Sequence, residues 1–159
     1  MPPRVVLKSP DQLIWKILQI IGVIFFLVGL LDIISSLLPQ RLGEPEWELG
    51  TTSNFFDVVP LFGLGLVFLL VAGVATGRRW NIRLVASFCL LTAVFMLLAM
   101  VLYATVLPLA LKIVQNDPVA STSILKAAAK TAVQALFYPF AMLWLAGAGW
   151  KASMGRKRS

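Results

Sequence analysis

Two aspartates are the residues of this sequence whose chemistry is least expected where they stand. Asp32 lies inside a long apolar run, and Asp57 lies near the start of another. Two carboxylates held close together can act as a general acid and a general base. No nucleophile, metal-ligand set or substrate motif accompanies them, and the chain has no histidine and a single cysteine, Cys89. We therefore predict that the protein is not an enzyme and has no catalytic, cofactor-binding or metal-binding residues.

Asp32 needs an explanation of its own. An ionisable side chain in a membrane span is costly and usually faces protein or water. One interpretation is a site for a proton, an ion or a partner. The other, which we favour, is a buried polar contact near the outer end of the helix, with one of three residues: Ser35, Ser36 or Asn54. Gly22, Gly29 and Asp32 are spaced by seven and three residues, which predicts a closely packed seam along one helix face.

The composition indicates which kind of protein must hold these residues. The 159 residues are 59% hydrophobic and 13% charged, with a mean hydropathy of +0.88. A soluble domain is about half apolar and about a quarter charged, and a soluble fold of this size has too little interior for so many apolar side chains. Apolar runs of about twenty residues match a hydrocarbon core roughly 30 Å thick. Four such runs cover residues 13–38, 55–76, 82–107 and 133–150.

These runs predict an all-α fold, an integral membrane four-helix bundle. We expect residues 13–151 to form one transmembrane helical domain. Residues 1–12 are then a cytoplasmic N-terminal segment, and residues 152–159 are a disordered basic tail.

Between the third and fourth runs, the sequence predicts a helical hairpin that projects from the outer face. Asn116, Asp117 and Pro118 form a strong turn signal, and the alanine-rich text from residue 124 favours a helix. We expect the third helix to continue to about Val114 and the fourth to begin near Ser121. Candidate caps of the fourth helix are Ser121, Thr122 and Ser123. The polar side of the hairpin should carry Lys112, Lys126 and Lys130.

The basic residues predict how the bundle is oriented. Ten Lys and Arg residues fall on one side of the predicted membrane: Arg4, Lys8, Lys16, Arg78, Arg79, Arg83, Lys151, Arg156, Lys157 and Arg158. Four fall on the other: Arg41, Lys112, Lys126 and Lys130. Because Lys and Arg are enriched in cytoplasmic segments, both termini should be cytoplasmic. The basic residues flank apolar runs, so the expected partner is the lipid bilayer and not nucleic acid.

The outer side is expected to be acidic near the second run. Residues 44–60 contain four of the seven acids: Glu44, Glu46, Glu48 and Asp57. We expect this stretch to be the first outer loop and the beginning of the second span, with Trp47 as an interfacial aromatic. Pro60 should then lie in the first turn of the span, where proline is tolerated.

Small and basic residues add candidates for packing and binding. Gly73 and Gly77 make a small-xxx-small pattern that is typical of close helix contact, and Pro139 should kink the fourth helix. Arg78, Arg79 and Arg83 with Trp80 form a basic, aromatic turn that we assign to topology and lipid headgroup contact; the alternative is docking of an acidic partner. The partner or packing candidates are Asp32, Trp47, Asp57, Pro60, Gly63, Arg78, Arg79 and Arg83.

The first half of the chain resembles the HpsJ-like membrane proteins of cyanobacteria, which are named for hormogonium polysaccharide secretion. The residues that carry the resemblance are Leu30, Leu31, Asp32, Pro45, Trp47, Asp57, Val59, Pro60, Leu61, Gly63 and Leu64. Members of that family often have a longer polar or coiled-coil segment, which this chain lacks. The resemblance implies a cyanobacterial plasma or thylakoid membrane and a non-catalytic accessory role.

Three functions remain open at this stage. The first is an accessory or scaffold subunit that binds a larger membrane protein complex, linked by the resemblance to polysaccharide secretion or membrane organisation. The second is a small subunit or assembly factor of a photosynthetic thylakoid complex. The third is a small transporter or channel that uses Asp32 and the Pro139 kink, which we rank low because no internal repeat is apparent.

Overall fold

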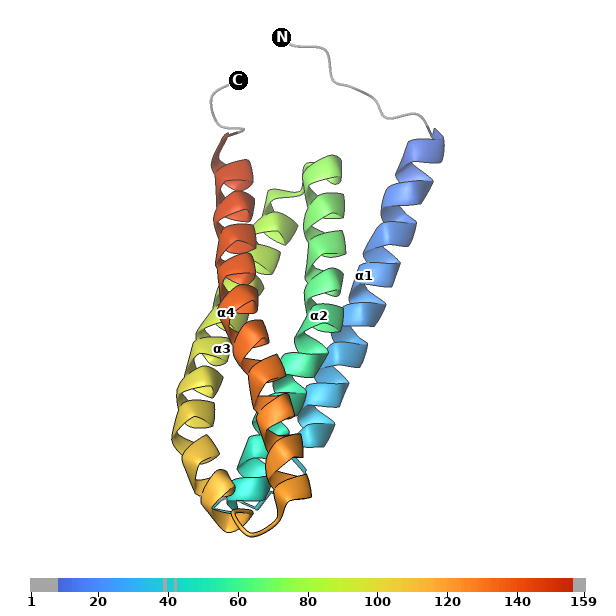
Figure 1. Cartoon of the computed structure of the whole chain (residues 1–159). Helices are drawn as coiled ribbons and strands as arrows, with labels where there is room; N and C mark the ends of the chain where they lie inside the picture. The colour runs from blue at the N-terminus through green and yellow to red at the C-terminus, as the bar shows by residue number, and fades with distance from the viewer. Residues whose placement is uncertain (1–8, 39, 42, 156–159) are drawn as a thin grey trace.

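The computed structural model describes residues 9–38, 40–41 and 43–155, and these contain four helices and no strand. The helices are α1 (Ser9–Ser36), α2 (Pro45–Thr76), α3 (Arg79–Ile113) and α4 (Pro118–Gly155). Each is long and apolar enough to cross a membrane. Figure 1 shows them side by side, with the start of α1 and the end of α4 at the same end as the α2–α3 turn. The predicted all-α, four-span bundle is confirmed.

Local chemistry explains where α2 ends and α4 begins. Gly77 follows α2 in the left-handed conformation (φ 71°), which a residue without Cβ adopts at low cost. Before α4, the Oδ1 atom of Asp117 accepts hydrogen bonds from the backbone N–H groups of Val119 (2.9 Å) and Ala120 (3.0 Å). The cap is therefore Asp117, and the prediction of a cap at residues 121–123 is wrong. Pro118 occupies the first helical position, where its missing N–H has no cost.

The start of α2 differs most from the prediction. The helix begins at Pro45, about ten residues before the predicted span, so most of the acidic stretch is helical and not a loop. Glu46 and Glu48 lie in the first turn, where carboxylates interact favourably with the positive end of the helix dipole. Pro60 consequently lies inside the helix and not in its first turn.

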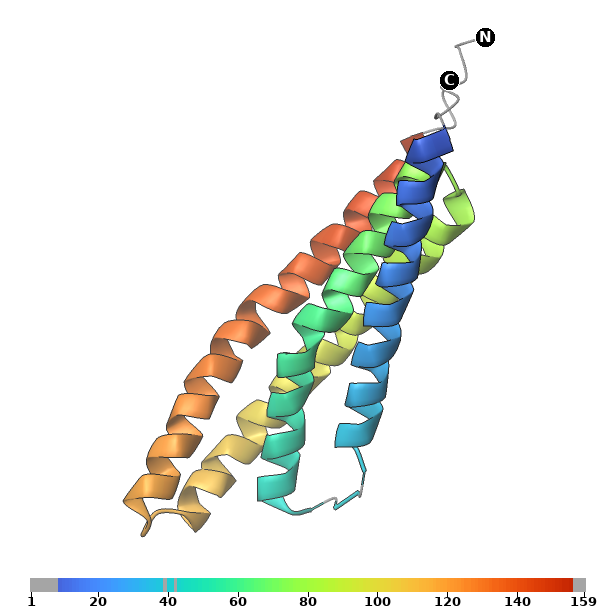
Figure 2. The same ribbon diagram turned by 90° about the vertical axis from the view of Figure 1, so that its right-hand side faces the viewer.

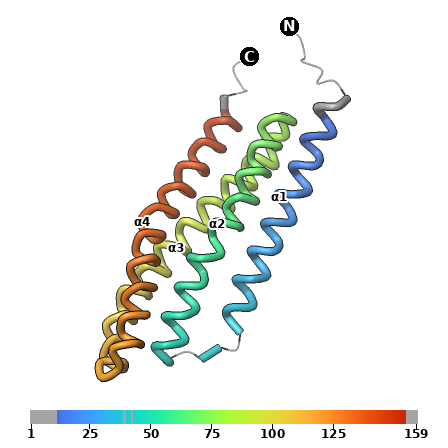
Figure 3. Tube along the Cα trace, turned by 45° about the vertical axis from the view of Figure 1, so that its right-hand side comes forward, coloured from blue at the N-terminus to red at the C-terminus, as the bar shows by residue number. Residues whose placement is uncertain are grey.

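Helix α2 is the centre of the arrangement. It packs against α1, α3 and α4, and α3 packs against α4, whereas α1 contacts only α2 along its backbone. Figure 3 shows α1 separated from α4 by the other helices. The main core lies among α2, α3 and α4, where Phe56, Leu66 and Met96 are almost completely buried. A second apolar cluster lies towards the end of the bundle where α3 connects to α4, and its members are Leu49, Tyr103, Val106, Ala110 and Ala128.

The α1–α2 contact is close because it is built on glycines. A Cβ placed at Gly65 would lie 2.6 Å from the backbone nitrogen of Phe26 and 2.8 Å from the carbonyl oxygen of Gly22. A Cβ at Gly29 would lie 2.9 Å from the Cβ of Phe62. The predicted seam is therefore present at both α1 glycines. Gly77, by contrast, is a helix C-cap, which explains it without the predicted interhelical contact.

The hairpin of α3 and α4 has nearly the expected length. Helix α3 ends at Ile113, as predicted, and α4 begins at Pro118, three residues before Ser121. Figure 2 shows the beginning of α2 beside the hairpin, where Leu49 of α2 packs in one apolar cluster with Tyr103 of α3 and Ala128 of α4.

The terminal boundaries also shift. Helix α4 continues to Gly155, so residues 152–155 of the predicted disordered tail are helical, and residues 9–12 of the N-terminal segment belong to α1. The remainder of both predicted segments, 1–8 and 156–159, lies outside the described residues.

Candidate functional site

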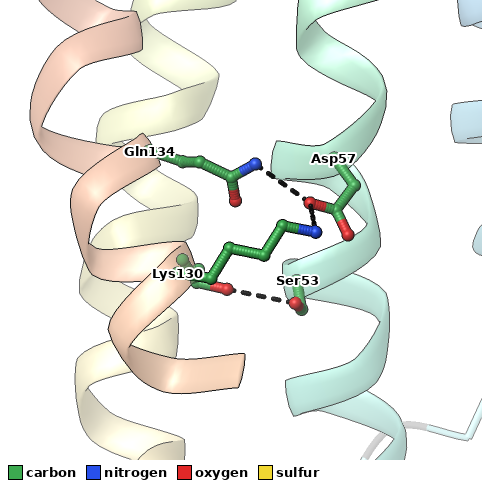
Figure 4. A network of polar contacts seen from close by, with 5 residues as sticks. Ser53, Asp57, Lys130 and Gln134 are labelled. Carbon is green, nitrogen blue, oxygen red and sulfur yellow. Dashed lines mark hydrogen bonds and ion pairs between the residues drawn. The ribbon is translucent and has the colours of Figure 1, made fainter. Parts of the chain in front are cut away.

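A polar cluster joins α2 to α4 between the two apolar clusters. The Nζ atom of Lys130 lies 2.7 Å from Oδ1 of Asp57, and Nε2 of Gln134 donates a hydrogen bond of 3.0 Å to the same oxygen. Figure 4 shows Lys130 and Gln134 reaching from α4 towards Asp57 on α2. One turn away, the hydroxyls of Ser53 and Thr131 are 3.0 Å apart. These five residues fix the register between the two helices.

The position of the cluster along the helices decides how much its ion pair contributes. Asp57 precedes Thr76, the last residue of α2, by 19 residues, which is about 28 Å of helix. Lys130 precedes Trp150 on α4 by a similar distance of about 30 Å. If the hydrocarbon core, roughly 30 Å thick, begins near the α2–α3 turn, the cluster lies at its opposite edge. The side chains of Lys130 and Asp57 are 59% and 38% exposed, so the pair is partly hydrated and its net contribution is modest.

The structure does not bring the two aspartates together. Asp57 is engaged with α4, whereas Asp32 is exposed on α1, which makes no backbone contact with α4. Among the described residues, the carboxylate of Asp32 has no hydrogen-bond or ion-pair partner; the Ser35 hydroxyl donates instead to the backbone oxygen of Asp32. The prediction of a buried contact to Ser35, Ser36 or Asn54 is therefore wrong.

The other candidates have separate positions. Trp47 is half-buried near the start of α2, and Pro60 is exposed on the same helix. Gly63 is buried against α4, because a Cβ there would contact the methyl group of Met142. Arg78, Arg79 and Arg83 are exposed at the other end of the bundle, around the start of α3.

Sequence reasoning did not identify the pairing of Asp57 with Lys130. A signal for it was present, because Ser53 and Asp57 are four residues apart on α2, and Lys130 and Gln134 are four apart on α4. Residues at this spacing share one helix face. Two such polar pairs, each preceding a long apolar stretch, favour facing positions at one membrane boundary.

Within the described ranges, no group of three or more Cys, Asp or Glu side chains is placed to hold a metal ion. No family model matches the chain, and no curated protein or solved structure matches it significantly. The class of protein therefore follows from the structure itself. It is an all-α integral membrane protein whose four helices are each long and apolar enough to span a bilayer.

Proposed function

We propose that the protein is a non-catalytic accessory subunit that binds a larger membrane protein complex through the uncovered face of α1. The observation that carries this proposal is Asp32, an unpartnered carboxylate set in an exposed apolar surface. Its neighbours on that surface include Ile24, Val28 and Leu31, which are 50%, 47% and 64% exposed. The resemblance to HpsJ-like proteins supports a complex for polysaccharide secretion or membrane organisation; a photosynthetic complex is the alternative.

The depth of Asp32 in the membrane makes its carboxylate costly unless a partner supplies hydrogen bonds. The apolar span of α1 covers Gln12–Ser36, so Asp32 lies eight residues, about 12 Å, from the middle of the span. That position is just inside the outer edge of a hydrocarbon core about 30 Å thick. A carboxylate in such a place is costly and usually pairs with protein or reaches water. A partner helix that offers Lys, Arg or an amide at this level would supply the missing hydrogen bonds.

The attachment of α1 to the rest of the chain is confined almost entirely to α2, which agrees with a docking role for its other faces. In the most apolar stretch of α1 only 11% of the residues are buried, compared with 50% in that of α2. Apart from its packing on α2, α1 contacts the rest of the described chain through the ring of Phe26, whose centroid lies 5.3 Å from that of Phe88 on α3. The rest of the helix surface is free to contact lipid or another membrane protein.

The test is capture of tagged full-length protein in several mild detergents, followed by native gel electrophoresis and mass spectrometry. We expect a stoichiometric partner with the unchanged chain, and its loss with Asp32→Asn. Glu44→Gln is the matched control, because it removes a carboxylate at the same end of the molecule, where Glu44 pairs with Arg41 at an exposed site. A partner retained equally by both variants would exclude Asp32 as the anchor. Recovery of a monomer or homo-oligomer alone in every detergent would refute the accessory function.

A further inference from the structure

Two hollows at the Arg-rich end of the bundle share the same two residues. The first, about 320 Å³, lies between α3 and α4 and is lined by Arg83, Ser87, Trp150, Ser153 and Met154. The second, about 380 Å³, runs along α3 and is lined by Trp80, Arg83, Leu84, Ser87, Phe88 and Leu91. Arg83 and Ser87 therefore lie where the two hollows meet.

The lining of the first hollow is mostly apolar, but three of its residues, Arg83, Ser87 and Ser153, carry polar groups for a headgroup. Trp150 lines the same hollow. The Ser153 hydroxyl donates to the backbone oxygen of Trp150. The side chains of Arg83 and Ser87 have no hydrogen-bond or ion-pair partner within the described part of the chain, so their donors are available. A guanidinium beside a hydroxyl is well suited to phosphate oxygens.

The second hollow is suited to a hydrocarbon chain. Trp80, Leu84, Phe88 and Leu91 follow one another at helical spacing, so they form a single stripe on α3. All four are exposed, from 37% for Phe88 to 76% for Trp80. The stripe extends eleven residues, about 16 Å, from Trp80 past Arg83 and Ser87 to Leu91. Its tryptophan lies at the end nearest the arginines, where an interfacial aromatic belongs.

We propose that this junction binds one anionic phosphoglyceride. The lipid phosphate lies on Arg83 and Ser87, its headgroup occupies the hollow between α3 and α4, and one acyl chain follows the deeper part of the stripe, along Phe88 and Leu91. The match is one of charge and of position. Arg83 supplies the positive charge where the two hollows meet, and the apolar lining of the second hollow continues beyond Ser87 towards the middle of α3. This inference does not rest on the proposed accessory function.

The experiment is native mass spectrometry of the purified full chain titrated with dioleoylphosphatidylglycerol and, separately, with dioleoylphosphatidylcholine. We expect one phosphatidylglycerol to bind about tenfold more tightly than phosphatidylcholine, because charge-assisted hydrogen bonds add to the contacts of the chains. Arg83→Gln should abolish the preference. Ser87→Phe should weaken phosphatidylglycerol binding with the protein charge unchanged, because the ring fills the junction.

Arg78→Gln is the matched control. It removes the same charge at the same end from an exposed position that lines neither hollow, and it should keep the preference. An equal loss in Arg78→Gln and Arg83→Gln would overturn the proposal in favour of general electrostatic attraction. Equal binding of the two lipids by the unchanged chain would also overturn it. Displacement of the lipid by excess inorganic phosphate would identify a site for the free anion instead. Thermal unfolding of each variant separates these outcomes from misfolding.

Discussion

The crossing of α1 and α2 makes a quantitative prediction for Gly65→Ala. The added Cβ would lie 2.6 Å from the backbone nitrogen of Phe26, whereas ordinary van der Waals contact begins near 3.4 Å. The two helices would have to separate by about 0.8 Å, the difference between these distances. The atoms in the way belong to the backbone, so no change of rotamer can remove the clash.

The cost of this separation is set by the packing around it. The rings of Phe26 and Phe62 are 4.8 Å apart at the same crossing, and Gly29 is in close contact with Phe62. Overpacking of this kind destabilises by about 1–3 kcal/mol. A glycine-to-alanine change in a helix also gives about 1 kcal/mol in the opposite direction through helix propensity. The destabilisation by the clash is therefore measured relative to glycine-to-alanine substitutions that gain the same helix propensity without a clash.

Gly50 on α2 and Gly147 on α4 provide those controls, because a Cβ at either position meets nothing within 4 Å. We expect Gly65→Ala to unfold in mixed detergent–SDS micelles with a free energy about 1–3 kcal/mol lower than that of Gly50→Ala or Gly147→Ala. Circular dichroism would follow the transition. If all three variants were equally stable, α1 and α2 would not approach each other as closely as the structure shows.

Two further experiments test the polar cluster that joins α2 to α4 and the start of α4. In a double-mutant cycle with Asp57→Asn and Lys130→Met, we expect the same unfolding assay to give a coupling free energy of about 0.5–1 kcal/mol, because the pair is partly exposed. A coupling of zero would show that the ion pair does not contribute to stability. Asp117→Ala should cost about 1 kcal/mol through loss of the helix cap and should accelerate hydrogen exchange at Val119 and Ala120; unchanged exchange there would contradict the capping role.

The sequence was sufficient for the spans and insufficient for the register between them. Runs of apolar residues determine which segments cross the bilayer, and the turn signal at Asn116, Asp117 and Pro118 predicted the end of α3 near Val114. The beginning of α2 did not, because Pro45 and a group of acids are also typical of a loop. Contact between Asp57 and Lys130 requires knowing which faces of α2 and α4 meet, and periodicity within each helix does not contain that information.

Helix geometry explains why the packing seam predicted on α1 is present at Gly22 and Gly29 but does not include Asp32. At about 100° per residue, Gly22 and Gly29 differ by about 20° around the helix, whereas Asp32 is displaced by about 60–80° from both. A helix that packs against a single neighbour buries only a narrow stripe. The glycines fall inside that stripe and Asp32 falls outside it, where it is exposed.

The two proposed binding regions lie at opposite ends of the bundle, and this separation makes their tests independent. Asp32 is near the C-terminal end of α1, whereas Arg83 lies in the second turn of α3, at the end that carries the α2–α3 turn. No described contact connects Asp32 to the core of α2, α3 and α4, and Arg83 is exposed. A local effect predicts that Asp32→Asn leaves lipid binding unchanged and that Arg83→Gln leaves partner capture unchanged. If either variant abolished both properties, the common cause would be loss of the bundle. We would then expect α1 to separate from α2 first at the crossing near Gly65, because close van der Waals packing makes most of the described contact there.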